Sequence, residues 1–142
     1  GYTDLAIGCP GTNSGKGGAL LYSGKSLTQT FSTPAGFLDG RGYPNTNASL
    51  ITKEHFGLSM VTSDLQRLGR PGIFLGSPTV TSPTGSIHAG ALEFWSGRSV
   101  AGVLAGRDPA QPNIRIQGVA PFHSVGQTIF WSDYLFLTTR ED

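Results

Sequence analysis

The sequence predicts an all-β fold assembled from short strands, and three observations favour it. The chain carries 21 glycines and 9 prolines among 142 residues, so it must turn often. Charged residues make up only 13 %, while apolar residues, at 37 %, suffice for a core. Short apolar or alternating runs lie between the turns, and no spacing of i, i+3, i+4 is sustained over a long helix.

Three segments recur in the same order further along the chain. In the first pair, an apolar run precedes Gly, a small residue and Pro. Both members of the second pair start with Gly-Ala-Leu and contain Ser-Gly, a basic residue and Ser near their end. In the third pair, a Gly is followed at the same distance by Ser-Asp. The pairs are 4–10 with 72–78, 18–27 with 90–100, and 55–64 with 124–133. Their offsets are nearly equal, and the small differences in length fall in loops, where insertions are tolerated. We therefore predict an internal repeat.

The strands are expected in the apolar runs that this repeat contains. In chain order they lie within 4–8, 18–24, 55–62, 72–78, 90–97 and 114–122. The best helical candidate is the short segment 49–56. Alternation in 91–95 sets Leu92 and Phe94 on one face and Glu93 and Trp95 on the other, with Phe94 in the core and Trp95 partly exposed.

Units of about 70 residues with about four short strands are typical of propeller blades. The chain holds about two such units, whereas a propeller needs roughly four to eight blades. We predict an incomplete propeller in which 1–54 is the end of one blade plus a linker and 55–100 is most of a second blade. Residues 101–142 are expected to form a linker and the start of a third, degenerate blade. The remainder of a longer propeller, or neighbouring chains, would complete the ring.

The recurring elements resemble FG-GAP repeats, the blades of the integrin α-subunit propeller and of the propeller of glycosylphosphatidylinositol-specific phospholipase D. Phe-Gly, Gly-Ala-Pro and a following Gly-plus-apolar strand mark that family. The corresponding residues here are Phe56-Gly57 with its weaker copy Val125-Gly126, then Gly8-Cys9-Pro10 and Gly76-Ser77-Pro78, then the strands that start at Gly18 and Gly90. The resemblance covers most of 1–97 in patches and, beyond that, 124–133.

The resemblance implies calcium loops of the form D-x-[DN]-x-D-G-x-x-D, in which oxygen ligands surround a hard cation. In the loop 64–72, Asp64 and the turn glycine Gly69 match, but Leu and Gly stand at the other carboxylate positions. One carboxylate is a poor ligand set, so we expect this degenerate loop to be empty. Asp4 matches the last ligand of a loop whose earlier ligands would precede Gly1. Asp4 and Asp64 are the candidate metal ligands, and calcium is the one cofactor suggested.

Other chemistry finds little support in the sequence. Gly15-Lys16 suggests a phosphate-binding loop, but the first glycine of that motif is replaced by Pro10 and Gly17 stands where Ser or Thr is needed. The three histidines show no i, i+2 or i, i+4 pair, and no G-x-S-x-G nucleophile elbow occurs. We therefore predict no catalytic residue in this segment, which leaves open whether a parent protein is an enzyme.

The charge and the sequence motifs limit the partners and the location. A net charge of +1 without any basic run argues against nucleic acid, and no apolar run approaches the length of a membrane span. Asn47 begins an Asn-Ala-Ser acceptor for N-glycosylation, which fits a secreted or cell-surface protein.

These observations favour a non-catalytic propeller segment of a larger secreted or cell-surface protein, acting in adhesion through a protein or glycan partner. Two alternatives stay open: the propeller portion of a glycosylphosphatidylinositol-specific phospholipase D whose zinc domain lies outside this chain, and a structural subunit of a larger assembly.

Overall fold

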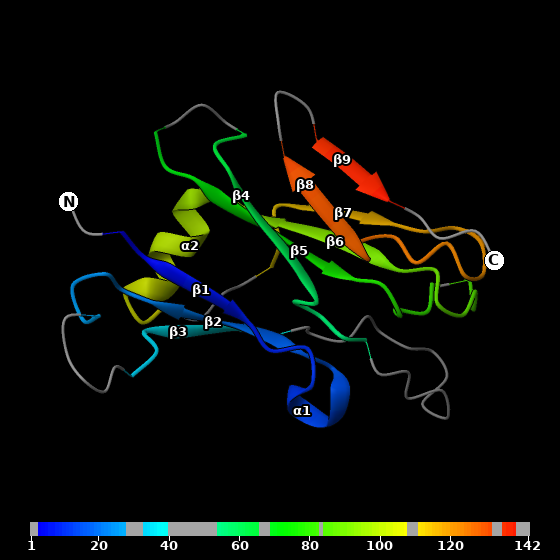
Figure 1. Cartoon of the computed structure of the whole chain (residues 1–142), viewed down its shortest axis with the longest axis horizontal. Helices are drawn as coiled ribbons and strands as arrows, with labels where there is room; N and C mark the ends of the chain where they lie inside the picture. The colour runs from blue at the N-terminus through cyan, green and yellow to red at the C-terminus, as the bar shows by residue number, and fades with distance from the viewer. Residues whose placement is uncertain are drawn as a thin grey trace.

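The chain forms three antiparallel sheets that follow one another along the sequence, as Figure 1 shows. This computed structural model describes residues 3–27, 33–39, 54–65, 69–82, 84–107, 111–131 and 135–138. The first sheet contains β1 (Leu5–Gly8), β2 (Gly18–Tyr22) and β3 (Gly36–Asp39). The middle sheet contains β4 (Ser59–Ser63), β5 (Gly72–Ser77), β6 (Ala91–Trp95) and β7 (Ile114–Gln117). The third pairs β8 (Thr128–Trp131) with β9 (Leu135–Thr138).

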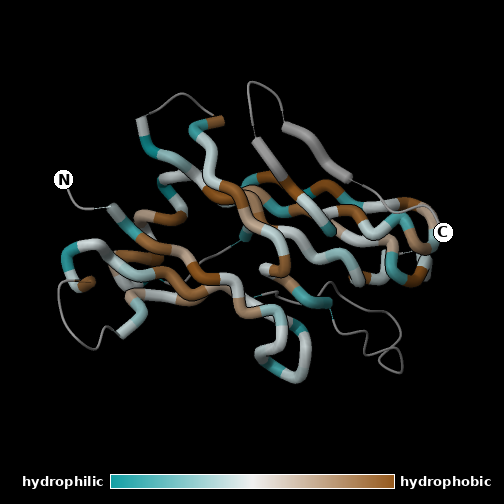
Figure 2. Tube along the Cα trace, in the orientation of Figure 1, coloured by the Kyte–Doolittle hydropathy of each residue, from teal (hydrophilic) through white to brown (hydrophobic). Residues whose placement is uncertain are grey.

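Each sheet is a meander in which consecutive strands pair, so the all-β expectation is confirmed for the described residues. The two central strands of the middle sheet are buried on both faces, since every residue of β5 and β6 is buried. Its near-continuous apolar runs, broken by few polar residues, are what a strand covered on both sides requires. In Figure 2 the hydrophobic stretches follow the strands, while the hydrophilic ones lie mostly in the connections.

Two separate hydrophobic clusters join the sheets. The cluster between the first and middle sheets contains Ala19, Leu21, Leu38, Phe56, Ile73, Leu75, Trp95 and Val103. The cluster between the middle and third sheets contains Phe74, Leu92, Phe94, Val125 and Ile129. Adjacent residues of β5 and β6 thus contribute to opposite faces, as the pleat of a strand demands. The alternation predicted for 91–95 is confirmed, but Trp95 is 2 % exposed and belongs to the core.

The contacts between neighbouring sheets recur along the chain. Gly17 and Phe56 form an isolated parallel bridge between the first and second repeat units, and Gly90 and Val125 form its counterpart between the second and third. Gly90 follows Gly17 in the sequence by close to one repeat length, and so does Val125 follow Phe56, so the two bridges join equivalent positions of successive units. The Phe56 N–H donates to the Lys16 carbonyl oxygen at 3.0 Å, and the Val125 N–H donates to the Ala89 carbonyl oxygen at 3.2 Å. In each case the acceptor is the residue before the bridged glycine.

Backbone conformation repeats at the same places. His55 and Ser124 both adopt positive φ angles, of 51° and 47°, just before the bridge residue. Gly57 and Gly126 follow it with φ angles of 83° and 85°, a conformation that favours glycine. The serine hydroxyl of Ser59 also donates to the Gly126 carbonyl oxygen at 2.5 Å, joining the middle and third sheets. The sequence repeat therefore corresponds to a structural one.

Within the described ranges, two short helical segments interrupt the strands. α1 (Thr12–Gly15) is a tight turn in which Asn13 and Ser14 have left-handed φ and ψ. α2 (Gly97–Leu104) is capped at its N-terminus by Ser96, whose side chain accepts a hydrogen bond from the Ser99 N–H, and the helix contacts β2, β3 and β5. α2 lies outside the segment 49–56, of which the described part, 54–56, is not helical.

The middle sheet extends beyond the segment 55–100. Its last strand, β7, confirms the strand expected within 114–122, although it joins the middle sheet rather than a third unit, and β3 is a strand of 1–54 that was not expected. The four residues of β3 carry too short a pattern to stand out from polar, glycine-rich surroundings. Neither helix in the described part of the chain has the length or the apolar run that crossing a bilayer would require.

Candidate functional site

The interface between the first and middle sheets contains the two features that stand out from an apolar core. One is a cavity at the end near α2, and the other is a group of charged residues around Glu54 and Glu93. Both depend on the sheet stacking described above, because β1 and β2 supply one wall and β4, β5 and β6 supply the other.

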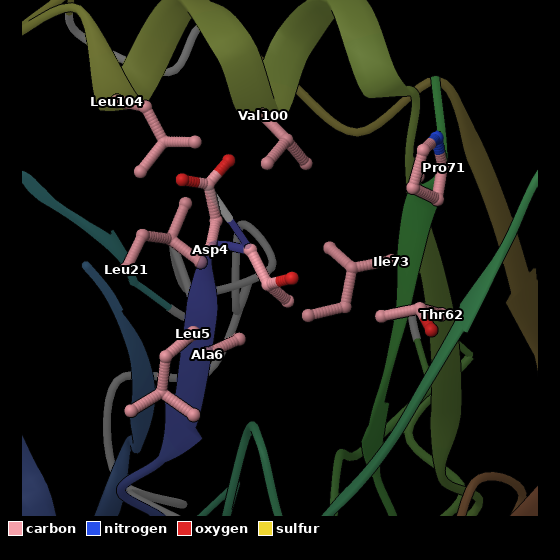
Figure 3. A pocket seen from close by; sticks show the side chains of 11 residues that line it. Asp4, Leu5, Ala6, Leu21, Thr62, Pro71, Ile73, Val100 and Leu104 are labelled. Carbon is pink, nitrogen blue, oxygen red and sulfur yellow. The ribbon is translucent and has the colours of Figure 1, made fainter. Parts of the chain in front are cut away.

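The cavity has a volume of about 470 Å³ and is lined mainly by apolar groups. Its lining residues are Thr3, Asp4, Leu5, Ala6, Leu21, Thr62, Pro71, Gly72, Ile73, Val100 and Leu104. Asp4 is the one charged residue among them, and Figure 3 shows its carboxylate on the side of Val100 and Leu104. An apolar chamber with a single carboxylate suits a group that combines apolar surface with a positive charge.

Asp4 also supports the backbone of its own sheet. Its Oδ1 accepts a hydrogen bond of 2.9 Å from the Gly24 N–H, beyond the end of β2. The position of Asp4 just before β1 places the carboxylate on the same side of the extended chain as Ala6, and both line the cavity. The candidate calcium ligand is therefore a residue that closes a turn and faces a cavity.

Asp64 holds a comparable local position. Its Oδ2 accepts a hydrogen bond of 2.7 Å from the Gly69 N–H, across the loop that follows β4. Among the described residues, no three His, Cys, Asp or Glu side chains gather in a group that could hold a metal ion. The donor set in the described part of this loop is the single Asp64 carboxylate, which is not a fit for calcium. Asn47, the predicted glycosylation acceptor, lies outside the described residues.

The charged group sits toward the other end of the same interface. Glu93 of β6 is 4 % exposed and stands opposite Arg115 of β7 in the strand register. Its Oε1 accepts hydrogen bonds from Arg115 Nη2 at 2.6 Å and from Nε at 2.9 Å. Pairing a buried carboxylate with a guanidinium offsets much of the cost of removing it from water.

Glu54 is the second buried carboxyl of this group, with 6 % of its surface exposed. The pKa of Glu54 is raised to about 7: burial is the main cause and the negative charge of Glu93 adds to it, while the positive charges of Lys16 and Arg115 offset part of the rise. Glu54 therefore exchanges its proton near neutral pH, unlike an ordinary carboxyl. Sequence reasoning did not single out this group, because its members come from four separate segments.

The phosphate-loop alternative is not supported by the geometry around Lys16. Gly17, at φ 85°, leads directly into β2 rather than into a helix whose N-terminus would face a phosphate. Lys16 instead acts on Glu54 electrostatically across the interface.

A scan against protein-family models matched no family, and a search of curated proteins gave no match.

Proposed function

We propose that this chain is a non-catalytic segment of an FG-GAP-type β-propeller, belonging to a larger secreted or cell-surface protein that binds a protein or glycan partner. The observation that carries the proposal is the recurrence of the same inter-sheet bridge at Gly17–Phe56 and Gly90–Val125. Sheets that stack with a constant contact are the building principle of propellers, in which each blade packs on the next.

The loops between strands support a binding role rather than catalysis. Two stacked meanders and a strand pair, in the described part of the chain, form a scaffold whose connections lie at the sheet ends, and such connections are where binding proteins place their contacts. A hydroxyl and an imidazole do meet, since Thr79 Oγ1 lies 3.2 Å from His55 Nδ1. His55, however, precedes the bridge residue Phe56, and its N–H donates to the Gly15 carbonyl oxygen, so this contact has a structural role in joining the sheets.

Binding to cell surfaces tests this function. The chain, fused to a fluorescent protein, is added to cells that are untreated, treated with trypsin, or treated with mixed glycosidases. We expect saturable binding that one of the two treatments removes, which would also assign the partner class. Absence of saturable binding to untreated cells would refute the proposed function, and the fluorescent protein alone serves as control.

The mass of the native particle tests the alternative of a structural subunit. A particle with the mass of a single chain would show that the protein is a monomer in solution, which counts against a subunit completed by neighbouring chains. A closed ring of several copies would instead favour an assembly role over adhesion by a single chain.

A further inference from the structure

We propose that the contact between the first and middle sheets is a latch operated by one proton: it stays closed while Glu54 is protonated and opens locally, without unfolding of the middle sheet, when Glu54 ionises. The first sheet then separates at the bridge between Gly17 and Phe56. The third sheet, joined by a separate bridge, remains in place. The proposal concerns the stacking of the sheets and does not depend on the partner class proposed above.

The position of Glu54 in the chain ties its charge to this bridge. It stands two residues before Phe56, whose N–H donates to the Lys16 carbonyl oxygen at 3.0 Å. The His55 N–H between them donates to the Gly15 carbonyl oxygen at 2.9 Å. Both bonds join the segment before β4 to the segment before β2. Movement of the Glu54 side chain out of the interface therefore disturbs the two bonds that hold the bridge.

Glu93 makes an ionised Glu54 unfavourable in the closed interface. Glu93 lies two residues before Trp95 in β6, so both side chains leave the same face of the strand, toward the first sheet. The charge of Glu93 is balanced by Arg115, which donates to Oε1 through Nε and Nη2. A second carboxylate beside this pair is repelled by Glu93 and must also be removed from water.

The other cation of the group, Lys16, compensates a second negative charge only weakly. It lies exposed in the turn before β2, where water screens its attraction to Glu54. The charges that act on Glu54 come from three segments: Lys16 before β2, Glu93 of β6 and Arg115 of β7. Protonation of Glu54 removes the conflict at low pH. At high pH, opening removes it by returning the carboxylate to water.

The bridge between the middle and third sheets differs at these positions. Val125 corresponds to Phe56, and the residue two positions before it is His123 instead of a glutamate. The acceptor that corresponds to Lys16 is Ala89. In the described part of the chain, the buried acidic residues both belong to the first interface. Ionisation of a carboxyl in the first interface therefore leaves the second bridge unchanged.

The size of the effect follows from the linkage between proton release and opening. In the closed interface the pKa of Glu54 is raised to about 7, against 4.5 for an ordinary glutamate. Between these pH values the closed form holds the proton and the open form does not, so opening is favoured as the pH rises. From pH 6 to pH 8 the opening constant should increase about tenfold, or about threefold after screening by water.

Hydrogen exchange of the backbone amides at the two bridges tests the latch, measured by NMR on the ¹⁵N-labelled chain at pH 6, 7 and 8. The His55 and Phe56 amides bond across the first interface. The Ser124 and Val125 amides bond at the equivalent positions of the second. Each rate is divided by that of an unstructured peptide at the same pH. Protection should fall about three- to tenfold at the first pair and stay constant at the second.

Urea below the unfolding transition separates local opening from global unfolding. Exchange through a local opening hardly depends on urea, whereas exchange through global unfolding accelerates steeply. The His55 and Phe56 amides should therefore exchange faster than those of β5 and show little dependence on urea. A loss of protection that parallels β5 in both pH and urea would overturn the latch, because Glu54 would then affect only the stability of the whole fold.

Replacement of Glu54 removes the proton on which the latch depends. Glu54→Gln should abolish the pH dependence of Phe56 protection, and its persistence in this variant would overturn the proposal. His55→Asn controls for the neighbouring imidazole, because asparagine tolerates the left-handed φ of this position. The pH dependence should remain in that variant. Thermal unfolding first compares each variant with the parent chain.

A change at Lys16 tests the same charges from the other sheet. Lys16→Met removes a charge that lowers the pKa of Glu54, so the loss of protection should move to higher pH. The bridge itself is kept, since its acceptor is the Lys16 backbone carbonyl. Lys25→Met, at another exposed lysine, is the matched control and should leave the midpoint unchanged. An unchanged midpoint in Lys16→Met would overturn the assignment of the latch to this group.

Discussion

Replacement of Glu54 by glutamine should remove most of a pH dependence from the stability of the fold. Below the ordinary carboxyl pKa of 4.5, the folded and the unfolded chain both hold the Glu54 proton. Between pH 4.5 and about 7 the unfolded chain releases that proton while the folded chain keeps it, so stability falls as the pH rises. Above about pH 7 both forms are ionised and the loss is complete.

The magnitude follows from the same two pKa values. At about 1.36 kcal/mol per pKa unit, the full difference sets an upper limit of about 3 kcal/mol. Screening by water near the carboxyl reduces this to about 1–2 kcal/mol. Because glutamine imitates the protonated acid, the excess stability of Glu54→Gln over the parent chain should be smallest at pH 5 and should grow toward that amount at pH 8.

Urea denaturation at pH 5, 6, 7 and 8 measures the effect, with the free energy of unfolding of the variant subtracted from that of the parent. The subtraction cancels the histidines, which titrate in the same range. Glu93→Gln is the contrasting variant: it should lower stability at every pH because Arg115 loses its partner, and it should move the Glu54 pKa downward. A parent chain and a Glu54→Gln chain with parallel pH profiles would refute the reasoning.

Three further predictions concern the packing and the surface. Gly76→Ala should lower the free energy of unfolding by more than about 2 kcal/mol, because its Cβ would meet the Gly126 carbonyl oxygen. Gly11→Ala is the control: a Cβ there meets open space, so it should change the free energy of unfolding by under about 0.5 kcal/mol, and thermal unfolding compares the two variants. Trp95→Ala should lower the free energy of unfolding by about 3–5 kcal/mol. Trp95→Phe should lower it less, since the indole N–H is buried without a hydrogen-bond partner in the described part of the chain, and equal losses in denaturant titrations would contradict this. Expression through the secretory pathway should add glycosidase-sensitive mass that Asn47→Gln abolishes, and a mass identical in both proteins would count against glycosylation.

The strands that the sequence predicted best are those with the longest apolar runs. β5 and β6 are buried on both faces, so nearly every residue is apolar and the pattern stands out against the turns. β7 was recognisable from the alternation of Ile114, Arg115 and Ile116, whereas the four residues of β3 are too few to show a pattern. The glycine-marked turns were recognisable because positive φ angles restrict which residues fit there.

The helix α2 had a signal that the glycines obscured. Val100, Val103 and Leu104 follow the i, i+3, i+4 spacing, and Ser96 is a favourable N-cap. Gly97 and Gly102 lower the helix propensity of a segment only eight residues long, so packing against β2, β3 and β5 supplies the stabilisation.

The candidate site was harder to predict than the fold. Glu93 and Arg115 are 22 residues apart, and their contact depends on the β6–β7 register, which no local pattern specifies. Glu54 joins them only because the first and middle sheets stack. Asp4 and Asp64 were found from a motif, yet the observed role of each is to accept a backbone N–H.

Because neighbouring sheets cover the central strands of the middle sheet on both faces, the sheets should differ in how readily they unfold locally. Since the two hydrophobic clusters of the described residues each join neighbouring sheets, stability is shared between adjacent pairs rather than held in one common core. The middle sheet contributes to both clusters and can open only when both are broken, whereas β8 and β9 can separate at the cost of one. The backbone amides of β5 and β6 therefore report the global unfolding of the chain, and those of the third sheet report a local event.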